Sequence, residues 1–497
     1  MKKVKNKFLY RTNTSKFVIA RRAFFPTKQS PHRARDCFGR VRPRNDGCTV
    51  ERNKIFSFMI GFAFVMLLLS GCNAQNAKGT TPVPPIAQST NISSAIQLVP
   101  TSAQIETVPP TLQPAPSATP HLASGHLWRF GVALVRKTLT AYDSYGIASM
   151  RFGWYVDFKV NAEALTPYGM EYVPTVRVKQ SKLAPDGTKT NCCVSCGYVE
   201  PYEYTVSPSV SQIKTTAAQH PGMTWLIGNE MDNRDTASSS SACWRQDEML
   251  PELYAQAYHD LYDAIKGADS TAQVAIGGMV EFTDLRRQYL DRVWAEYSRL
   301  YGQTMPVDIW NTHLYVLQEA TGSFGAGIPA GFSETSGAQY SILDNKDFTK
   351  AWAQIVSLRA WMKDHGLQNK PLIISEYGVN MPVWVECPAY PDITSCPFNP
   401  ERVRDGFMVP SFDAFLNQTD VNIGYPADGY RLVQRWNWWS VDFDDGNCDG
   451  GVFLEYFGGS LFNSGLGPAS PPTDCSFPDQ GITLLGTYWK QYVQNLP

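Results

Sequence analysis

Short apolar runs recur along residues 121–497, and each is followed by a loop or by a segment with helical periodicity. The runs have the length and the aromatic and β-branched content of buried strands. Eight such runs occur, at 127–134, 149–158, 172–178, 223–230, 273–282, 307–316, 371–379 and 430–441. Apolar residues three and four positions apart predict helices between them, over 252–268, 284–301, 347–365 and 402–417.

This alternation of strand and helix predicts an α/β fold, a (β/α)8 TIM barrel. An open, doubly wound sheet is the alternative, because one miscounted strand would favour it. Long irregular stretches follow five of the strands, at 179–204, 231–250, 317–345, 380–401 and 442–479. In a barrel these βα loops gather on the C-terminal face, where the active sites of barrel enzymes lie.

Three segments of different composition precede this domain. Residues 1–54 are basic, with 16 Lys/Arg against 3 Asp/Glu, and residues 55–72 carry no charge. Residues 73–120 are rich in Pro, Thr and Ser, contain no aromatic residue and carry only Lys78 and Glu106 as charges, so they predict a disordered linker. The folded domain is expected to begin at about residue 121.

The uncharged segment has the pattern of an export signal. Its apolar stretch, residues 55–69, spans roughly 22 Å as a helix, less than the ~30 Å of a bilayer core. The residues that follow, Leu69-Ser70-Gly71-Cys72, resemble a bacterial lipobox, in which the cysteine becomes lipidated. A single-span membrane anchor is the alternative. Both predict a domain held at the extracellular face of the cell membrane.

Charge and composition limit the function classes. Residues 73–497 hold 28 Lys/Arg against 42 Asp/Glu, so the exported part is acidic, which argues against a nucleic-acid partner. The chain of 497 residues is 43% hydrophobic, enough for a large core, which excludes wholesale disorder.

Cysteines concentrate in the long loops. The chain has eleven cysteines, and eight remain after Cys37 and Cys48, which precede the signal, and the lipidation candidate Cys72 are set aside. An even number in an exported domain predicts disulfides. The eight candidates are Cys192, Cys193, Cys196, Cys243, Cys387, Cys396, Cys448 and Cys475. The sequence leaves the pairing open, although Cys387 with Cys396 and Cys448 with Cys475 would close local loops at low entropic cost. A zinc site formed by the first four is the alternative.

Two glutamates end two of the predicted strands. Glu230 closes the fourth run in TWLIGNEMDN, and Glu376 closes the seventh in PLIISEYGVN. An Asn-Glu on strand four and a Glu on strand seven resemble the retaining glycoside hydrolases of clan A. The resemblance implies that Glu230 is the acid/base and Glu376 the nucleophile. Met231 stands where many clan members have proline, which leaves the family within the clan open.

The same resemblance implies roles for four neighbouring residues. Arg151, in SMRFGW, matches the arginine that steadies the nucleophile. In NTHLYV, His313 matches a residue that lines the sugar subsite, and Tyr315 matches the tyrosine that hydrogen-bonds the nucleophile. Asn229 matches the asparagine that binds the sugar 2-hydroxyl.

Tryptophans are candidates for a sugar platform. Trp439 resembles the strand-eight tryptophan of the clan, which lies beneath the cleaved sugar, and strand alternation points Trp438 the other way. Trp154, Trp244 and Trp384 lie in or beside the predicted mouth loops and are candidates to stack on sugar faces.

Other chemistries have weaker support. The sequence contains no H-E-x-x-H, G-x-S-x-G or Walker motif, and we predict neither a metal nor a cofactor. Asp232 and Glu281 are the substitutes if Glu230 is not the acid. A calcium site is a further alternative, although the EF-hand register is not met at Gly446. Its oxygen ligands would come from Asp442, Asp444, Asp445, Asn447 and Asp449.

Together these features predict a surface-anchored retaining glycoside hydrolase, with residues 121–497 as its catalytic domain. Its substrate is expected to be a polysaccharide or oligosaccharide with β-glycosidic bonds, cleaved by double displacement. The alternatives are a non-catalytic carbohydrate-binding lipoprotein on a barrel scaffold and a solute-capture lipoprotein. A lectin needs no acid/base pair, and a solute-capture protein would need two α/β lobes.

Overall fold

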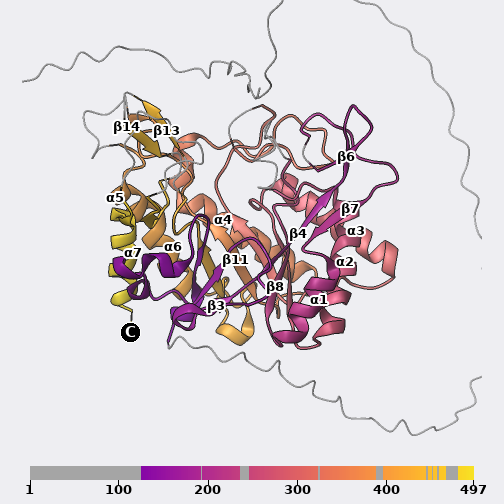
Figure 1. Cartoon of the computed structure of the whole chain (residues 1–497), viewed down its shortest axis with the longest axis horizontal. Helices are drawn as coiled ribbons and strands as arrows, with labels where there is room; N and C mark the ends of the chain where they lie inside the picture. The colour runs from indigo at the N-terminus through magenta and orange to yellow at the C-terminus, as the bar shows by residue number, and fades with distance from the viewer. Residues whose placement is uncertain are drawn as a thin grey trace, which may run out of the picture. The chain divides into compact units, whose positions relative to one another are not determined.

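The computed structural model describes most of residues 125–496 (Figure 1). The basic region, the predicted signal with Cys72 and the linker lie outside the described residues, as do Cys192, Cys243, Trp244 and Cys475. Within the described part of the chain, no helix is both long and apolar enough to cross a membrane. The described ranges are 125–191, 193–234, 246–322, 325–387, 396–443, 446–449, 452–455, 458–465 and 479–496.

Parallel strands form the centre of the domain. One sheet has the order β10 (Trp310–Leu314), β11 (Leu372–Tyr377), β12 (Arg435–Trp438), β1 (Phe130–Ala133), β2 (Trp154–Val156) and β3 (Glu171–Tyr172). A second has the order β7 (Tyr204–Ser207), β4 (Thr175–Gln180), β8 (Thr224–Asn229) and β9 (Gln273–Gly278). All these pairs are parallel except β7 with β4.

The two sheets continue into each other along the chain. Only Val173 and Pro174 separate β3 from β4, and a parallel bridge joins Ala275 of β9 to Ile309, just before β10. Apart from β7, the neighbours therefore follow one another in chain order from β1 to β12, and β1 pairs with β12. The structure is thus a parallel α/β arrangement, as the alternating pattern predicts.

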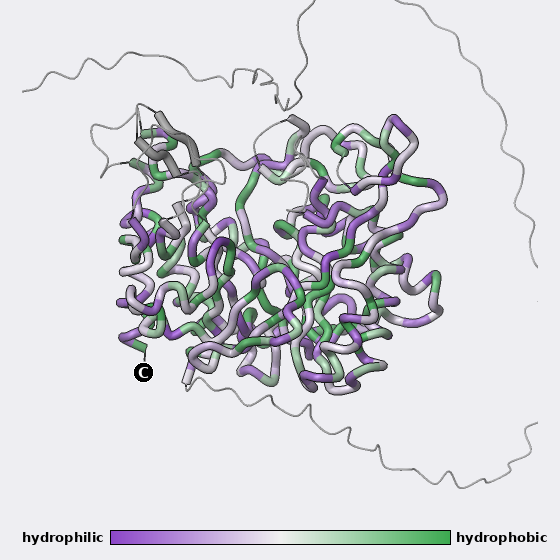
Figure 2. Tube along the Cα trace, in the orientation of Figure 1, coloured by the Kyte–Doolittle hydropathy of each residue, from purple (hydrophilic) through white to green (hydrophobic). Residues whose placement is uncertain are grey.

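The central strands are buried on both faces, which explains why they appear as continuous apolar runs (Figure 2). Trp436 and Trp438 of β12 belong to the large core that includes helical side chains. A separate cluster draws one or two residues from most strands, including Trp154, Leu226 and Ile373. The Trp154 indole occupies the space where a Cβ on Gly131 would lie, 2.4 Å from Cε2, so only glycine fits there.

Helices cover the outer side of the strands (Figure 1). They are α1 (Val210–Gln219), α2 (Pro251–Ala268), α3 (Asp284–Tyr301), α4 (Phe348–Asp364), α5 (Pro400–Val403), α6 (Val409–Asn417) and α7 (Leu484–Gln494). The predictions over 252–268, 284–301 and 347–365 match α2, α3 and α4 to within one residue at each end. The predicted helix over 402–417 is instead α5 and α6, joined by a π-helical turn at Arg404–Met408.

Disulfides brace two of the long loops. Cys387 pairs with Cys396, as predicted from their short spacing. Cys193 pairs with Cys196, which removes two thiolates from the alternative zinc site. The hairpin of β5 (Lys182–Leu183) with β6 (Lys189–Thr190) lies in the loop after β4, which also contains the Cys193–Cys196 disulfide. The hairpin of β13 (Gly446–Asp449) with β14 (Val452–Glu455) lies in the loop after β12, and both hairpins are at the upper end of Figure 1.

Candidate active site

Glu230 and Glu376 converge on one histidine. Glu230 directly follows β8, Glu376 lies near the end of β11, and both are buried, at 6% and 7% exposed. His313 of β10 places Nδ1 3.1 Å from Glu230 Oε1 and 3.9 Å from Glu376 Oε2. One nitrogen or oxygen atom from each of the three side chains lies within 4.8 Å of the others. The structure therefore brings these three predicted residues together.

The backbone beneath His313 explains its position. A Cβ on Gly278, at the end of β9, would lie 2.3 Å from His313 Cδ2, so a glycine is required for the imidazole to lie there. The Gly278 carbonyl accepts a hydrogen bond of 2.8 Å from the Glu230 amide. Glu230 itself has a left-handed backbone, with φ of 51°, at the turn that leaves β8.

Tyr315 contacts the second glutamate. Its hydroxyl donates a hydrogen bond of 2.7 Å to Glu376 Oε1, as the clan resemblance implied. The side chain is buried, and its backbone carbonyl accepts a 2.7 Å hydrogen bond from Gln354 Nε2 of α4. Because the hydroxyl proton points at the carboxylate, this contact favours ionised Glu376.

The charges of the three central side chains depend on one another. The contact with His313 outweighs burial and lowers the pKa of Glu230, whereas both carboxylates raise the pKa of His313. Burial raises the pKa of Glu376 to about 7, and the charge of Glu230 adds to the rise. In the substrate-free site, Glu376 is therefore the more readily protonated carboxyl group.

The cation beside the carboxylates is Arg177, not Arg151. Arg151 precedes β2, and its Nη1 donates to the Val493 carbonyl of α7 at 2.8 Å, so the guanidinium is engaged away from Glu376. Arg177 lies on β4, and its charge acts on both glutamates. An arginine inside the apolar run YVPTVRV was the sequence signal that could have identified it.

Glu230 has two further amide neighbours that the sequence analysis missed. Asn233 Nδ2 lies 3.4 Å from Glu230 Oε2, and Gln246 also hydrogen-bonds the carboxylate. Asn229 is buried, and its backbone amide donates a hydrogen bond of 2.9 Å to Asp247 Oδ2. Gln246 and Asp247 come from the long loop after β8, whose residues 235–245 lie outside the described residues.

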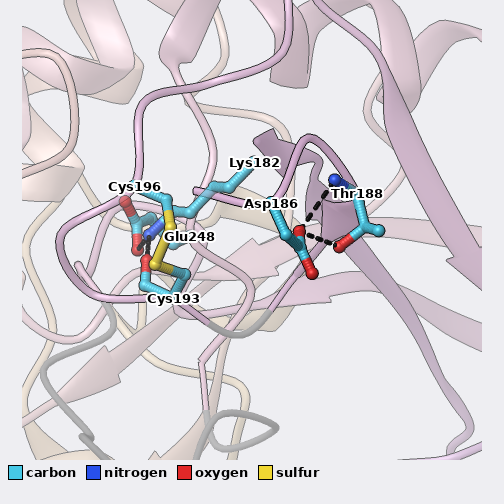
Figure 3. Close-up of a disulfide and its surroundings, with 6 residues drawn as sticks. All are labelled: Lys182, Asp186, Thr188, Cys193, Cys196 and Glu248. Atoms are coloured by element: carbon cyan, nitrogen blue, oxygen red, sulfur yellow. Dashed lines mark hydrogen bonds and ion pairs between the residues drawn. A yellow bond between two sulfur atoms is a disulfide. The ribbon is translucent and has the colours of Figure 1, made fainter. Parts of the chain in front are cut away.

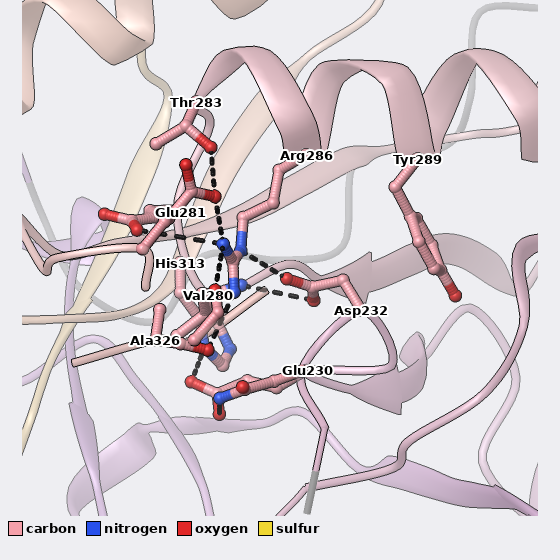
Figure 4. Close-up of polar contacts among 12 residues, drawn as sticks. Glu230, Asp232, Val280, Glu281, Thr283, Arg286, Tyr289, His313 and Ala326 are labelled. Atoms are coloured by element: carbon pink, nitrogen blue, oxygen red, sulfur yellow. Dashed lines mark hydrogen bonds and ion pairs between the residues drawn. The ribbon is translucent and has the colours of Figure 1, made fainter. Parts of the chain in front are cut away.

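Asp232 and Glu281, the predicted substitutes for the acid, lie in a separate cluster of buried charges. Both are fully buried around Arg286, together with Glu319 and Thr283 (Figure 4). Arg286 Nε lies 2.7 Å from Asp232 Oδ2, and Arg286 Nη1 lies 3.9 Å from Glu281 Oε1. Asp232 is therefore paired with an arginine outside the His313 contact, and Glu281 lies at a longer distance from the same arginine.

The tryptophans divide between the site and the core. Trp439 is half-buried, packs against Phe158 and Phe443 with ring centroids 5.4 Å apart, and donates its amide to the Tyr377 carbonyl. Trp438 is fully buried and donates Nε1 to the Gly459 carbonyl, so the predicted alternation is confirmed. Trp384 is 36% exposed on a loop. The prediction for Trp154 is wrong, because its ring is fully buried and Nε1 donates to the Arg129 carbonyl.

Metal chemistry has two candidate locations in the described part of the chain. Asp442 accepts hydrogen bonds from the amides of residues 135–137 and from Tyr142 Oη, so its oxygens fix a loop. The remaining side chains of the calcium alternative lie outside the described residues. The other candidate is the set Glu230, His313 and Glu376, whose atoms already hydrogen-bond one another and Tyr315.

Comparisons with known proteins find similarity only to solved structures. No family model and no curated protein matches the sequence. The chain is similar to a glucosidase from Croceicoccus marinus, with 10% identity, a TM-score of 0.33 and coverage of 63% of this chain and 60% of that one. It is also similar to a family 39 glycoside hydrolase from Bacteroides cellulosilyticus, with 12% identity, a TM-score of 0.35 and coverage of 69% and 61%.

A third similar structure is the catalytic core of xylanase A, with 11% identity, a TM-score of 0.36 and coverage of 68% of this chain and 94% of that one. The chain thus spans only about 60% of the glucosidase and of the family 39 enzyme. At these scores the similarities assign no activity to this chain.

Proposed function

We propose that the protein is a retaining glycoside hydrolase that cleaves β-glycosidic bonds of a polysaccharide or oligosaccharide. The observation that carries the proposal is the convergence of Glu230 and Glu376, from the ends of β8 and β11, on His313. Their nearest oxygens lie within 4.8 Å of each other. Retaining enzymes hold their two carboxyl groups about 5–5.5 Å apart, and inverting enzymes about 6.5–9.5 Å. The short separation supports double displacement.

The strand order supports a barrel as the scaffold. Counting β3 and β4 as one strand, eight parallel strands are neighbours in chain order, and β1 pairs with β12. Such an order is that of a (β/α)8 barrel, whose active site lies where the strands end. Glu230, His313 and Glu376 all lie at or near the C-terminal ends of their strands.

In the proposed cycle, Glu376 attacks the anomeric carbon while Glu230 gives a proton to the leaving oxygen. The bond from carbon to that oxygen breaks, and a glycosyl ester of Glu376 forms. A water molecule then attacks the same carbon, gives its proton to Glu230 and releases Glu376 as the carboxylate. Tyr315 hydrogen-bonds Glu376 and Arg177 adds positive charge nearby, so both stabilise the leaving carboxylate.

This cycle requires a proton on Glu230 and none on Glu376, the reverse of the preference in the substrate-free site. His313 contacts both carboxylates and is therefore placed to carry the proton from one to the other. Glu376 must be ionised to attack, so we expect activity to fall as the pH drops below the Glu376 pKa of about 7.

We also propose that Cys72 and the apolar segment at 55–72 tether the enzyme to the extracellular face of the membrane. This part of the proposal rests on the lipobox pattern alone. The second candidate function is a carbohydrate-binding lipoprotein without catalysis. A binding protein has no need for two buried carboxylates that share a histidine and receive a tyrosine hydroxyl, and this arrangement favours the enzyme.

The test uses the full-length protein in detergent with a panel of β-linked polysaccharides and aryl glycosides. Proton NMR of the first product should show the anomer of the substrate, and the inverted anomer would exclude double displacement. Glu230→Ala should still form the glycosyl-enzyme from activated aryl glycosides, and azide should then accelerate turnover and give a β-glycosyl azide. Glu281→Ala is the matched control and should show no azide effect. Azide rescue there, with none at Glu230, would overturn the assignment.

A further inference from the structure

We infer that Asp247 is a positioning residue for the catalytic pair: it holds Arg177 beside the two glutamates and fixes the backbone on either side of Glu230. This inference rests on the proposed function and extends it to a residue outside any strand. Asp247 follows the long loop after β8 and was not singled out by any sequence motif.

Both oxygens of the Asp247 carboxylate accept hydrogen bonds. Its oxygens lie 2.9 and 3.0 Å from Arg177 Nε, and Oδ1 lies 2.8 Å from Arg177 Nη2. Oδ2 also accepts hydrogen bonds from the amides of Val178, at 3.2 Å, and Asn229, at 2.9 Å. The side chain of Asp247 is 3% exposed and that of Arg177 is 18% exposed. One carboxylate thus binds the Arg177 guanidinium and a backbone amide from each of β4 and β8.

The segment that carries Asp247 runs along the end of β8. The Asp247 amide donates to the Asn229 carbonyl, and the Met249 amide donates to the Met231 carbonyl, each at 2.9 Å. These two bonds lie on either side of Glu230. On the other edge of the segment, the backbone amide of Gln180 in β4 donates a hydrogen bond of 3.2 Å to the backbone carbonyl of Glu248. The turn that presents Glu230 is therefore fixed by residues 247–249.

Arg177 supplies a charge that does not titrate. The groups that act on Glu376 are His313 from β10, Glu230 after β8, Tyr315 after β10, and Arg177 from β4. His313 can lose its proton, but a guanidinium cannot, so Arg177 favours ionised Glu376 at every working pH. Its fork binds Asp247 through two nitrogens, which fixes where this charge lies.

Glu248 provides a matched control in the same segment. It is 4% exposed and pairs with buried Lys182, with Nζ 2.7 Å from Oε2, while Tyr198 Oη donates to Oε1 at 2.7 Å. Lys182 also donates to the Cys193 carbonyl, in the loop closed by the disulfide to Cys196 (Figure 3). Glu248 therefore binds Lys182 and through it the disulfide loop, whereas its neighbour Asp247 binds Arg177.

The experiment compares Arg177→Gln, Asp247→Asn and Glu248→Gln in the full-length protein. For the first two, we expect kcat to fall at least tenfold and the acidic limb of the kcat/KM profile to move up by about 0.5–1 pH unit. The double variant should lose no more than the worse single variant, because both act through one pair. Glu248→Gln should keep the wild-type profile. An unmoved profile in Arg177→Gln, or a downward move in Asp247→Asn, would overturn the inference.

A second measurement separates this inference from the proposed function. Carbon-13 NMR of side-chain carboxyl groups, with the Glu376 signal assigned through Glu376→Gln, follows its titration without any substrate. Loss of Arg177 should raise its midpoint, even if the wild type cleaves no glycoside tested. Arg177→Lys keeps the positive charge but lacks the planar guanidinium, so it should raise the Glu376 midpoint by less. It replaces Arg177→Gln in the experiment if that variant does not fold. Equal midpoints in the wild type and all folded Arg177 variants would refute the role.

Discussion

Two clusters of buried ionisable groups lie near the ends of β8 to β11, and they differ in the basic side chain at their centre. Figure 4 shows Glu230 and His313 of one cluster beside Asp232, Glu281 and Arg286 of the other. In one, Glu230 and Glu376 share His313. In the other, Asp232, Glu281 and Glu319 surround Arg286, whose side chain is 0% exposed. Below, we call them the His313 cluster and the Arg286 cluster.

The Arg286 cluster connects loops rather than presenting groups to a substrate. Beyond its acidic partners, Arg286 donates to the carbonyls of Ala326 and Gly327, in the loop after β10. Glu319, from the same loop, accepts from Thr283 Oγ1 at 2.6 Å, at the start of α3. A guanidinium keeps its charge and its planar geometry at every working pH, so its contacts with these loops do not depend on pH.

The comparison shows how similar acidic surroundings serve different ends. Each cluster has more carboxyl groups than central cations, which together with burial favours a protonated carboxyl group in each. Burial raises the pKa of Glu281 to about 8 in the Arg286 cluster, and that of Glu376 to about 7 in the His313 cluster. Only the His313 cluster has a central cation that can itself release a proton. This difference is consistent with the proposed function, in which the His313 cluster transfers protons and the Arg286 cluster supports loops.

The largest expected difference comes from replacing one buried glutamate by glutamine in each cluster. Glu376→Gln deletes the proposed nucleophile, so kcat/KM should fall by at least ~10⁴-fold on every substrate. Glu281→Gln replaces an already protonated group with a neutral one of the same shape, so kcat/KM should stay within about threefold of wild type. Initial rates of the two purified variants on one aryl glycoside measure both. Similar losses in the two would mean that the clusters do not divide the work as proposed.

The sequence predicted much of the His313 cluster, because its residues end strands that are apolar and regular. Glu230, Glu376, His313 and Tyr315 all lie at or just beyond the ends of predicted strands, and the structure brings them together. The helices α2, α3 and α4 were predicted for a related reason, since their apolar spacing is unbroken.

What the sequence did not reveal depends on contacts between distant segments. Asp247 acts through Arg177, which lies 70 positions earlier in the chain, and an aspartate in a polar loop carries no local signal of such a partner. The motif that resembles the clan indicated Arg151, but this residue lies before β2 and contacts α7, and no motif indicated Arg177. Trp154 was predicted to lie near the mouth loops, but its side chain is buried. The sequence pattern does not tell which face of a strand points to the centre of the fold.

The next largest difference is expected in stability. Arg286→Met leaves Asp232 and Glu319 buried beside each other without their cation, which should cost about 3–5 kcal/mol of unfolding free energy. His313→Gln should cost only about 1–2 kcal/mol, because an amide can still hydrogen-bond Glu230, yet it should abolish most activity. Urea unfolding followed by far-UV circular dichroism gives both free energies. A larger loss for His313→Gln would reverse the assignment of catalytic and supporting clusters.

The smallest expected effect concerns the pH dependence of stability. The pKa of Glu281 is about 8 in the folded protein, against the ordinary value of 4.5, because burial disfavours its charged form and Glu319 adds repulsion. Between these two values the folded state holds a proton that the unfolded state has released, so this group makes stability fall as the pH rises.

Glu281→Gln cannot release a proton and should remove that part of the slope. From about pH 6 to pH 8, we expect the wild type to lose roughly 1–2 kcal/mol more than the variant, or a few degrees in Tm. Thermal unfolding across this range measures the difference, with the exposed Glu163→Gln as the control. Asp232 and Glu376 also have raised pKa values and contribute slopes of the same sign, but they remain in both proteins and cancel in the comparison. Parallel curves for the wild type and Glu281→Gln would mean that Glu281 is ionised in the folded state, and that the Arg286 cluster holds three charged carboxylates.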